Sequence, residues 1–238
     1  MPSSLDLLGF GPNGWGGRLL GGALLTLQLA FATLPFGLAL GLGVALAKNS
    51  PSRWLRLAGN IYTTLFRALP ELLTIFLVYI GGTLLLSRLA GLVQPGARVD
   101  INSFIAGMVA LALVLGAFSS EVFLGALNGV DRGQVEAGRA LGLKRLQGFV
   151  LIVLPQLWRL ALPGLANSWL VLLKDTSLVS AIGLSDLMRQ TQVAVGSTKQ
   201  PFLFFAATCL IYLCLSLLST GLGLWLERRA NRGFQVQH

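Results

Sequence analysis

Apolar residues in this chain gather in long runs, each broken by a short polar or charged segment. A helix needs roughly 20 apolar residues to cross the hydrocarbon core of a membrane. Windows of that length recur and predict five membrane spans, at about residues 19–47, 59–86, 103–127, 160–182 and 202–226. The pattern therefore predicts an all-α, polytopic membrane bundle that forms a single transmembrane domain over residues 1–238.

The fourth span can be placed in two frames. A window over residues 149–173 is also apolar enough, but it would contain Pro155, Arg159 and Pro163. Proline interrupts the helical hydrogen-bond ladder, and a charged side chain is costly in hydrocarbon. The later frame, residues 160–182, is therefore the one predicted.

Composition and charge also indicate a membrane protein. Hydrophobic residues make up 54% of the chain and charged residues only 11%, whereas soluble domains carry roughly 25% charged residues. The net charge of +9 does not indicate a nucleic-acid partner, because most basic residues lie in segments between apolar runs. The segments on the side of the C-terminus hold 11 Lys and Arg residues and those on the other side hold 5. This asymmetry predicts an N-terminus outside the cell and a C-terminus in the cytoplasm.

Residues that build metal or catalytic sites are scarce. The single histidine, His238, is the last residue, and Cys209 and Cys214 share one apolar run at a spacing typical of no zinc or redox motif. No nucleophile–base spacing and no G-x-x-x-x-G-K-[ST] phosphate loop occurs. The chain is therefore predicted not to be an enzyme and to have no catalytic, metal-binding or cofactor-binding residues of its own.

A charged stretch interrupts the apolar pattern between the predicted third and fourth spans. It reads EAGRALGLKRLQGFVLIVLP from Glu136 to Pro155 and opens as a short amphipathic helix on the predicted cytoplasmic side. Gly142 would permit a bend between two short helices, and Pro155 would end the second of them before the next span. On these residues alone the segment could dock on a partner protein or lie among lipid headgroups.

The spacing in this stretch resembles the EAA signature of importer-type ABC transporter permeases: EAA, three residues, glycine, nine residues, then I-x-L-P. Every fixed position matches except the third, where Gly138 replaces alanine. The segments GQVEAGRALG, KDTSLVSAIGLSDL and TLFRALPELL and the closing LERR are similar to the polar-amino-acid branch of that family. The resemblance covers nearly the whole chain and is nearest to Q-type permease subunits of histidine/lysine/arginine/ornithine importers. Two departures are Ala68, where relatives typically have glycine, and Leu124, where many have arginine.

The resemblance implies a type I permease subunit that moves polar, in particular basic, amino acids across a bacterial inner membrane. It implies a cytoplasmic coupling helix within a segment at about residues 131–155 that seats in an ATPase subunit. Ala137, Gly138 and Leu141 are expected to face the groove of that subunit. The residues assigned to coupling are Glu136, Ala137, Gly138, Arg139, Leu141, Gly142, Ile152, Leu154 and Pro155.

The same resemblance implies a set of partners. These are a homologous permease chain in a heterodimer, two ATPase subunits that bind ATP and Mg²⁺, and a periplasmic or lipid-anchored substrate-binding protein. The alternative function is a secondary amino acid transporter or channel that works without ATP. Such a protein would be expected to show inverted repeats with broken helices, which the five predicted spans do not.

Charged residues inside the predicted spans are candidates for the substrate path, because such residues usually face a protein interior or a water-filled passage. Arg67 and Glu71 stand four apart on one predicted helical face, so an ion pair between them and a contact of Glu71 with a cationic substrate both remain open. Lys174 is expected to compensate the charge of Asp175. The candidate path residues are Arg67, Glu71, Glu121, Lys174 and Asp175.

Overall fold

The computed structural model describes residues 4–11, 14–94 and 99–231, and within these ranges it consists of helices and turns with no strand. Five helical stretches are long and apolar enough to cross a membrane. The predicted all-α fold with five spans is confirmed for the described residues. The five stretches are Gly16–Lys48, Glu71–Val93, Ser103–Asn128, Arg145–Ile182 and Pro201–Ala230.

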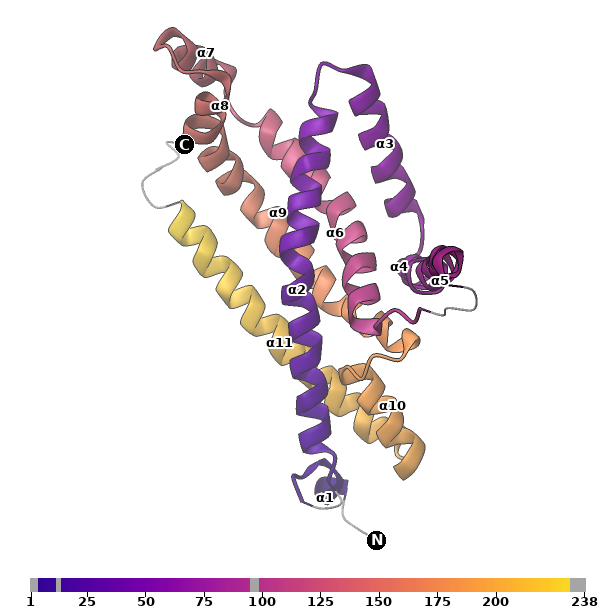
Figure 1. Cartoon of the computed structure of the whole chain (residues 1–238). Helices are drawn as coiled ribbons and strands as arrows, with labels where there is room; N and C mark the ends of the chain where they lie inside the picture. Colours follow the sequence, from indigo (N-terminus) through magenta and orange to yellow (C-terminus); the bar gives the residue numbers. More distant parts are fainter. Residues whose placement is uncertain (1–3, 12–13, 95–98, 232–238) are drawn as a thin grey trace.

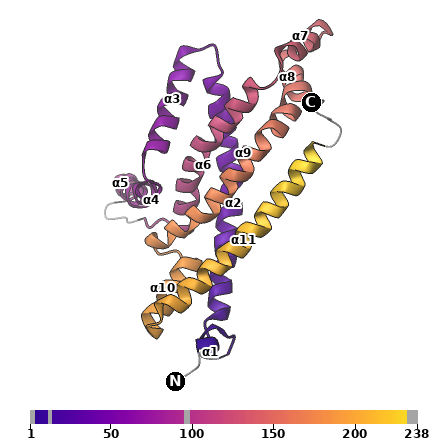
Figure 2. The same ribbon diagram turned by 180° about the vertical axis from the view of Figure 1, so that it is seen from behind.

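The helices lie in a tilted bundle with two distinct ends. Figure 1 shows α1 and α10 at one end, and α7, α8 and the turn between α2 and α3 at the other. Figure 2 shows from behind that α3, α4 and α5 lie on one side of the bundle and α11 on the opposite side. The elements are α1 (Ser4–Leu8), α2 (Gly16–Lys48), α3 (Arg53–Ala68), α4 (Glu71–Phe76), η1 (Leu77–Gly81), α5 (Gly82–Val93), α6 (Ser103–Asn128), α7 (Arg132–Ala140), α8 (Arg145–Gly148), η2 (Phe149–Val153), α9 (Leu154–Asp175), η3 (Thr176–Ile182), α10 (Leu187–Thr198) and α11 (Pro201–Ala230).

The packing of α2 against α6 forms the centre of the bundle. Small residues let the two helices approach closely: a Cβ added to Gly37 would stand 2.5 Å from a methyl carbon of Leu115, and Gly41 meets Ser119 in the same way. The Ser119 hydroxyl donates to the Leu115 carbonyl at 2.7 Å, so this buried polar group is satisfied within its own helix. In contrast, α5 and α11 leave most of their large apolar side chains exposed, as expected of surfaces that meet lipid or another chain.

The second predicted span, residues 59–86, is divided in the structure at Leu69 and Pro70. Both residues have extended backbone, with ψ of 139° and 136°, and α4 begins only at Glu71. Proline has no N–H to donate and disfavours helical backbone in the residue before it, which explains the break. The membrane-spanning stretch is therefore Glu71–Val93, and α3 is a separate amphipathic helix.

The fourth span is one continuous helical stretch, Arg145–Ile182, that includes both frames considered from the sequence. Pro155 lies in the first turn of α9, directly after the π-helical turn η2. A π turn widens the hydrogen-bond ladder locally, which accommodates a residue that has no N–H. Pro155 therefore does not end a short helix before the span, contrary to the expectation from the sequence.

Buried polar contacts fix α10 against α2 and α11. The Leu187 N–H donates to Thr26 Oγ1 at 3.3 Å, and the hydroxyls of Thr191 and Thr208 share a hydrogen bond of 2.5 Å. Gly22 provides the close approach, because a Cβ there would stand 2.8 Å from the Leu187 Cα. These contacts hold α10 in a fixed position at the end of the bundle opposite to α7.

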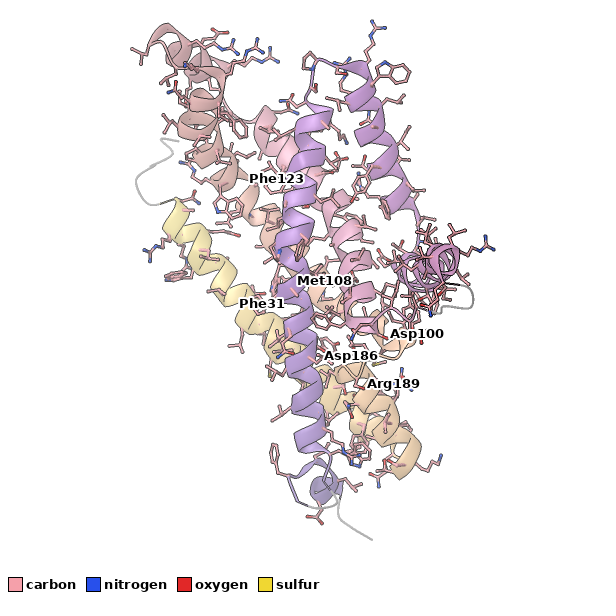
Figure 3. The ribbon with its side chains drawn as sticks, in the orientation of Figure 1. Phe31, Asp100, Met108, Phe123, Asp186 and Arg189 are labelled. Atoms are coloured by element: carbon pink, nitrogen blue, oxygen red, sulfur yellow. The ribbon has the colours of Figure 1, made fainter. Side chains whose placement is uncertain are left out.

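Asp186 begins α10 and is fully buried. Its Oδ1 accepts a hydrogen bond from the Arg189 N–H at 2.9 Å, and Figure 3 places both residues near the lower part of α2. Burial raises the pKa of Asp186 to about 6, although backbone N–H groups and the charge of Arg189 act in the opposite direction. The ionised carboxylate is therefore disfavoured in the folded protein.

We expect the attachment of α10 to weaken as the pH rises. Because the folded pKa of about 6 exceeds the ordinary value of 3.8, the stabilisation is complete below the ordinary pKa and is lost as the pH rises through the folded pKa. Amide hydrogen exchange in α10 should accelerate roughly tenfold between pH 5 and 8 after correction for intrinsic rates. Asp186→Asn keeps the acceptor for the Arg189 N–H and should remove most of this dependence, whereas Asp131→Asn, at an exposed cap, should not. An unchanged profile in Asp186→Asn would contradict the expectation.

Candidate functional site

The charged segment that follows α6 starts with a capped helix. The Asp131 carboxylate accepts a hydrogen bond from the Gly133 N–H at 2.7 Å, which satisfies a free donor at the start of α7. The side chain of Gln156 in α9 donates to the Gln134 side chain at 2.6 Å. This bond ties α7 to the helix that forms the fourth span.

A glycine bend ends α7. Gly142 has a φ of +83°, a left-handed conformation that glycine adopts without the steric cost of a Cβ. Its N–H donates to the Arg139 carbonyl at 2.9 Å, and the Leu143 N–H donates to the Gly138 carbonyl at 3.1 Å. This pair of bonds is the Schellman motif that closes a helix C-terminus. The structure thus has a bend at Gly142, as the signature glycine predicts.

Gly138 is the buried residue of α7, and it faces Ile152 in η2. A Cβ added to Gly138 would stand 2.5 Å from Ile152 Cδ1. The contact gives a physical reason for the fixed distance between these two signature positions, because the bend folds α7 back onto the turn that carries Ile152. Gly138 therefore packs within its own chain, and the expectation that it faces a groove of a partner is not supported.

The surface of this segment around the bend between α7 and α8 exposes apolar side chains. Leu141 is 85% exposed and Leu146 is 73% exposed, although both are large hydrophobic residues next to charged ones. Glu136, Ala137 and Arg139 are also exposed. Exposed leucines on a short helix that extends from the bundle are typical of a surface that another protein covers. The remaining signature residues lie inward or beside it: Ile152 and Leu154 are half-buried, and Pro155 is exposed.

A second cluster of charges lies between α2, α3 and α6. The Lys48 ammonium is 2.5 Å from the Glu121 carboxylate, and the Arg67 guanidinium is 3.6 Å from the same oxygen. The Lys48 side chain is only 10% exposed, whereas that of Arg67 is 48% exposed. Arg67 therefore pairs with Glu121, and the ion pair with Glu71 considered from the sequence is absent because the break at Pro70 separates their helices.

Two cavities adjoin this cluster. The first, of about 470 Å³, is lined by the three charged residues together with polar side chains of α3. The second, of about 190 Å³, is lined by Asn167, Ser168, Asp175 and apolar residues of α6 and α9. Phe118 lines both cavities, and the Arg67 guanidinium lies 5.6 Å from the centre of its ring. Phe118 thus lies where a space lined by charged and polar residues adjoins a mostly apolar one.

The fold brings Glu71 and Asp175 close together, although they are far apart in the sequence. Helix α4, which starts at Glu71, packs against η3, which follows Asp175 directly. Lys174 is exposed, while the two acids are half-buried. The compensation of Asp175 by Lys174 stays a prediction, and the Asp175 carboxylate belongs to the lining of the second cavity.

The sequence alone did not identify Lys48 or Phe118 as site residues. Lys48 is the last residue of α2 and belongs with the loop residues in the sequence, whereas Glu121 lies seven residues before the end of α6, so the pattern gives no sign that they meet. Phe118 is one of 13 phenylalanines, and nothing in the pattern distinguishes it. Among the residues that the structure describes, no group of three or more His, Cys, Asp and Glu side chains could hold a metal ion.

Comparison with known proteins shows which family the chain matches and which proteins it is similar to. Residues 37–232 match the family described as the binding-protein-dependent transport system inner membrane component. The chain belongs to this family. It is 41% identical over 230 residues to the octopine transport system permease protein OccQ of Agrobacterium tumefaciens (strain Ach5), covering 97% of each chain. It is 40% identical over 221 residues to the histidine/lysine/arginine/ornithine transport system permease protein HisQ of Escherichia coli (strain K12), covering 92% of this chain and 96% of HisQ.

A solved structure agrees with these relatives. The crystal structure of an amino acid ABC transporter with histidines matches with a TM-score of 0.75 and 31% identity, over 90% of this chain and 95% of that one. The chain is therefore a multi-pass inner membrane permease subunit of an ABC importer and not an enzyme. The family resemblance inferred from the EAA-like spacing is confirmed.

Proposed function

We propose that this permease translocates basic amino acids of the arginine, lysine, histidine and ornithine class. The observation that carries the proposal is the Asp175 carboxylate in the lining of the cavity with Asn167 and Ser168, with Glu71 at the start of the neighbouring helix α4. Two carboxylates on neighbouring elements offer a favourable position for a cationic side chain, because opposite charges attract strongly away from water. The names of two relatives support the same class of substrate: HisQ, and the arginine ABC transporter permease protein ArtQ of Escherichia coli (strain K12), which is 40% identical over 220 residues.

The proposed path passes from this cavity, around Phe118, to the larger cavity at Glu121. Glu121 would receive the cationic group after it leaves the two acids, in competition with Lys48 and Arg67. The proposed orientation, from the distribution of basic residues, places α10 outside and the α7 end in the cytoplasm. Substrate would thus move from the acidic pair towards the cytoplasmic end.

The proposed assembly contains a homologous permease chain, two ATPase subunits that bind ATP and Mg²⁺, and a substrate-binding protein outside the membrane. The exposed leucines of the coupling segment would seat in an ATPase subunit, with Glu136 and Arg139 at the rim of the contact. ATP-driven closure of the ATPase pair would move these segments and shift the bundles between inward-facing and outward-facing states. The driving free energy is the difference in nucleotide affinity between the two states.

Uptake by the reconstituted complex tests the proposal. Vesicles that contain the co-expressed subunits and internal ATP are expected to accumulate radiolabelled arginine, with lysine and histidine as competitors. Glu71→Gln should lower the uptake rate at limiting arginine about tenfold, which corresponds to the loss of roughly 1.4 kcal/mol of free energy of interaction with the substrate. Glu227→Gln, near the end of α11, is the matched control and should leave the rate unchanged. Uptake without nucleotide would favour a secondary transporter, and an unchanged Glu71→Gln would remove Glu71 from the path.

A further inference from the structure

A third cavity, of about 240 Å³, lies between α7 and the start of the fourth span. Its rim carries three basic side chains, Arg139, Lys144 and Arg145. Within the described residues, none of the three makes an ion pair with an acidic group, and all are exposed. Three neighbouring cations without a counter-charge attract an anionic ligand.

The interior of this cavity is apolar. Val135, Leu143, Phe149 and Val153 line it and are half-buried. A ligand that fits must therefore combine a negative group with hydrocarbon. The volume is too small for a whole lipid but is sufficient for a headgroup and the adjoining part of an acyl chain.

The cavity lies at the level expected for lipid headgroups. Phe149 and Val153 belong to the first turns of the fourth span, and α8 lies at the same end of the bundle as the turn between α2 and α3. Trp54, directly after that turn, is 81% exposed, as is typical of tryptophan at a membrane–water interface. Basic pockets between helices on the cytoplasmic side are suited to the phosphate of an anionic lipid.

We propose that this cavity binds an anionic phospholipid of the inner leaflet, with the phosphate held by Arg139, Lys144 and Arg145. The ATPase subunit is the competing occupant. The most exposed apolar residues of the segment, Leu141 and Leu146, do not line the cavity, so a protein seated on those leucines leaves it accessible from the membrane. The inference rests on the proposed function for the position of the segment at the cytoplasmic face. The lipid would hold α7 against the span helix from the side that the ATPase does not cover.

Lipid retention measures this site without relying on transport. The detergent-purified complex is titrated with dioleoyl phosphatidylglycerol, and retained lipid is counted by native mass spectrometry. The variant Arg139→Gln/Lys144→Gln/Arg145→Gln should bind this lipid roughly tenfold or more weakly, since each cation near a membrane surface contributes to anionic-lipid binding. Arg53→Gln/Arg228→Gln/Arg229→Gln removes three cations that do not line the cavity and should bind as the wild type does.

Further measurements distinguish a lipid site from a site for a free phosphate group and from a contact with the ATPase subunit. Lysine at all three rim positions should retain the lipid, and glycerol phosphate, which lacks acyl chains, should not compete with it. Equal retention by the wild type and the glutamine variant would overturn the proposal. Loss of the ATPase subunit during purification of Lys144→Gln/Arg145→Gln, which keeps the Arg139 assigned to the rim of the ATPase contact, would also overturn it, because these two cations would then bind the ATPase and not a lipid. ATP-dependent uptake by the wild type tests the proposed function separately, so its failure is distinguishable from failure of the lipid site.

Discussion

Replacing Glu121 with glutamine is expected to destabilise the protein and to reduce uptake more than any other single change in the charge cluster. The substitution leaves the Lys48 ammonium without a counter-ion in a position where its side chain is only 10% exposed. Removing one partner of a fully buried pair costs about 3–5 kcal/mol. Because Glu121 is 34% exposed, we expect a smaller loss of unfolding free energy, about 2 kcal/mol.

The measurement is a thermal unfolding series in detergent. A loss of about 2 kcal/mol corresponds to a melting temperature roughly 4–8 °C lower for a chain of this size. Arg67→Gln is the matched comparison and should lower the melting temperature by only about 1–2 °C, since Arg67 is half-exposed and 3.6 Å from Glu121. A melting temperature of Glu121→Gln equal to that of the wild type would show that the pair contributes no stability.

A double substitution distinguishes a structural role from a role in transport. Lys48→Gln/Glu121→Gln leaves no unpaired buried charge and should recover most of the lost stability. If Glu121 also receives the cationic substrate, uptake by the double variant should remain at least about tenfold below that of the wild type, because the contact between this carboxylate and the substrate is lost. Recovery of both stability and uptake in the double variant would show that the pair only holds α2 to α6.

The general fold follows from the sequence because span-length apolar runs have few alternatives in a membrane. Lipid offers no partner for an unpaired backbone group, so each such run must be helical. The helix boundaries at Pro70 and Pro155 do not follow from the apolar pattern in the same way. Pro70 ends a helix in the structure, whereas Pro155 is accommodated by the π turn η2. A proline alone does not determine which of these occurs, because the outcome depends on the hydrogen bonds around it.

The candidate site was predictable to different extents in its two parts. The EAA-like segment is local, so the bend at Gly142 could be inferred from its spacing, whereas the inward position of Gly138 and the place of Pro155 inside a continuous helix required the folded chain. The charge cluster depends on contacts between distant helices. The pairing of Lys48 with Glu121 and the packing of α4 against η3 are set by tertiary contacts, which the periodicity of a single sequence does not show.

Enlarging Gly138 is expected to separate ATP hydrolysis from transport. A Cβ at this position would stand 2.5 Å from Ile152 Cδ1, the far end of a flexible side chain. Gly138→Ala should therefore be tolerated after a small shift of Ile152, in agreement with the alanine that the EAA signature has there. Gly138→Val places branched carbons against Ile152 and should move α7 away from η2, at a cost of about 1–3 kcal/mol.

The consequence of that displacement is mechanical. The proposed coupling segment can transmit movement only if α7 and the fourth span move together, and the Gly138–Ile152 contact is one of the few that join them. We expect Gly138→Val to reduce arginine uptake about tenfold or more while the complex still hydrolyses ATP, a loss of roughly 1.4 kcal/mol of coupling. The ratio of ATP hydrolysed to arginine transported in vesicles measures this directly. Gly125→Val, at a position of α6 with open space around its Cβ, is the matched control.

A compensating change makes the prediction specific. Ile152→Ala removes the methyl carbon that the new side chain would meet, so Gly138→Val/Ile152→Ala should restore the ratio towards the wild-type value. Rescue of this kind requires that the two side chains interact, because substitutions at independent sites add. If Ile152→Ala fails to rescue coupling, the defect of Gly138→Val has another cause: the low helical propensity of valine or a change on the outward face of α7. In that case the Gly138–Ile152 contact does not transmit the movement.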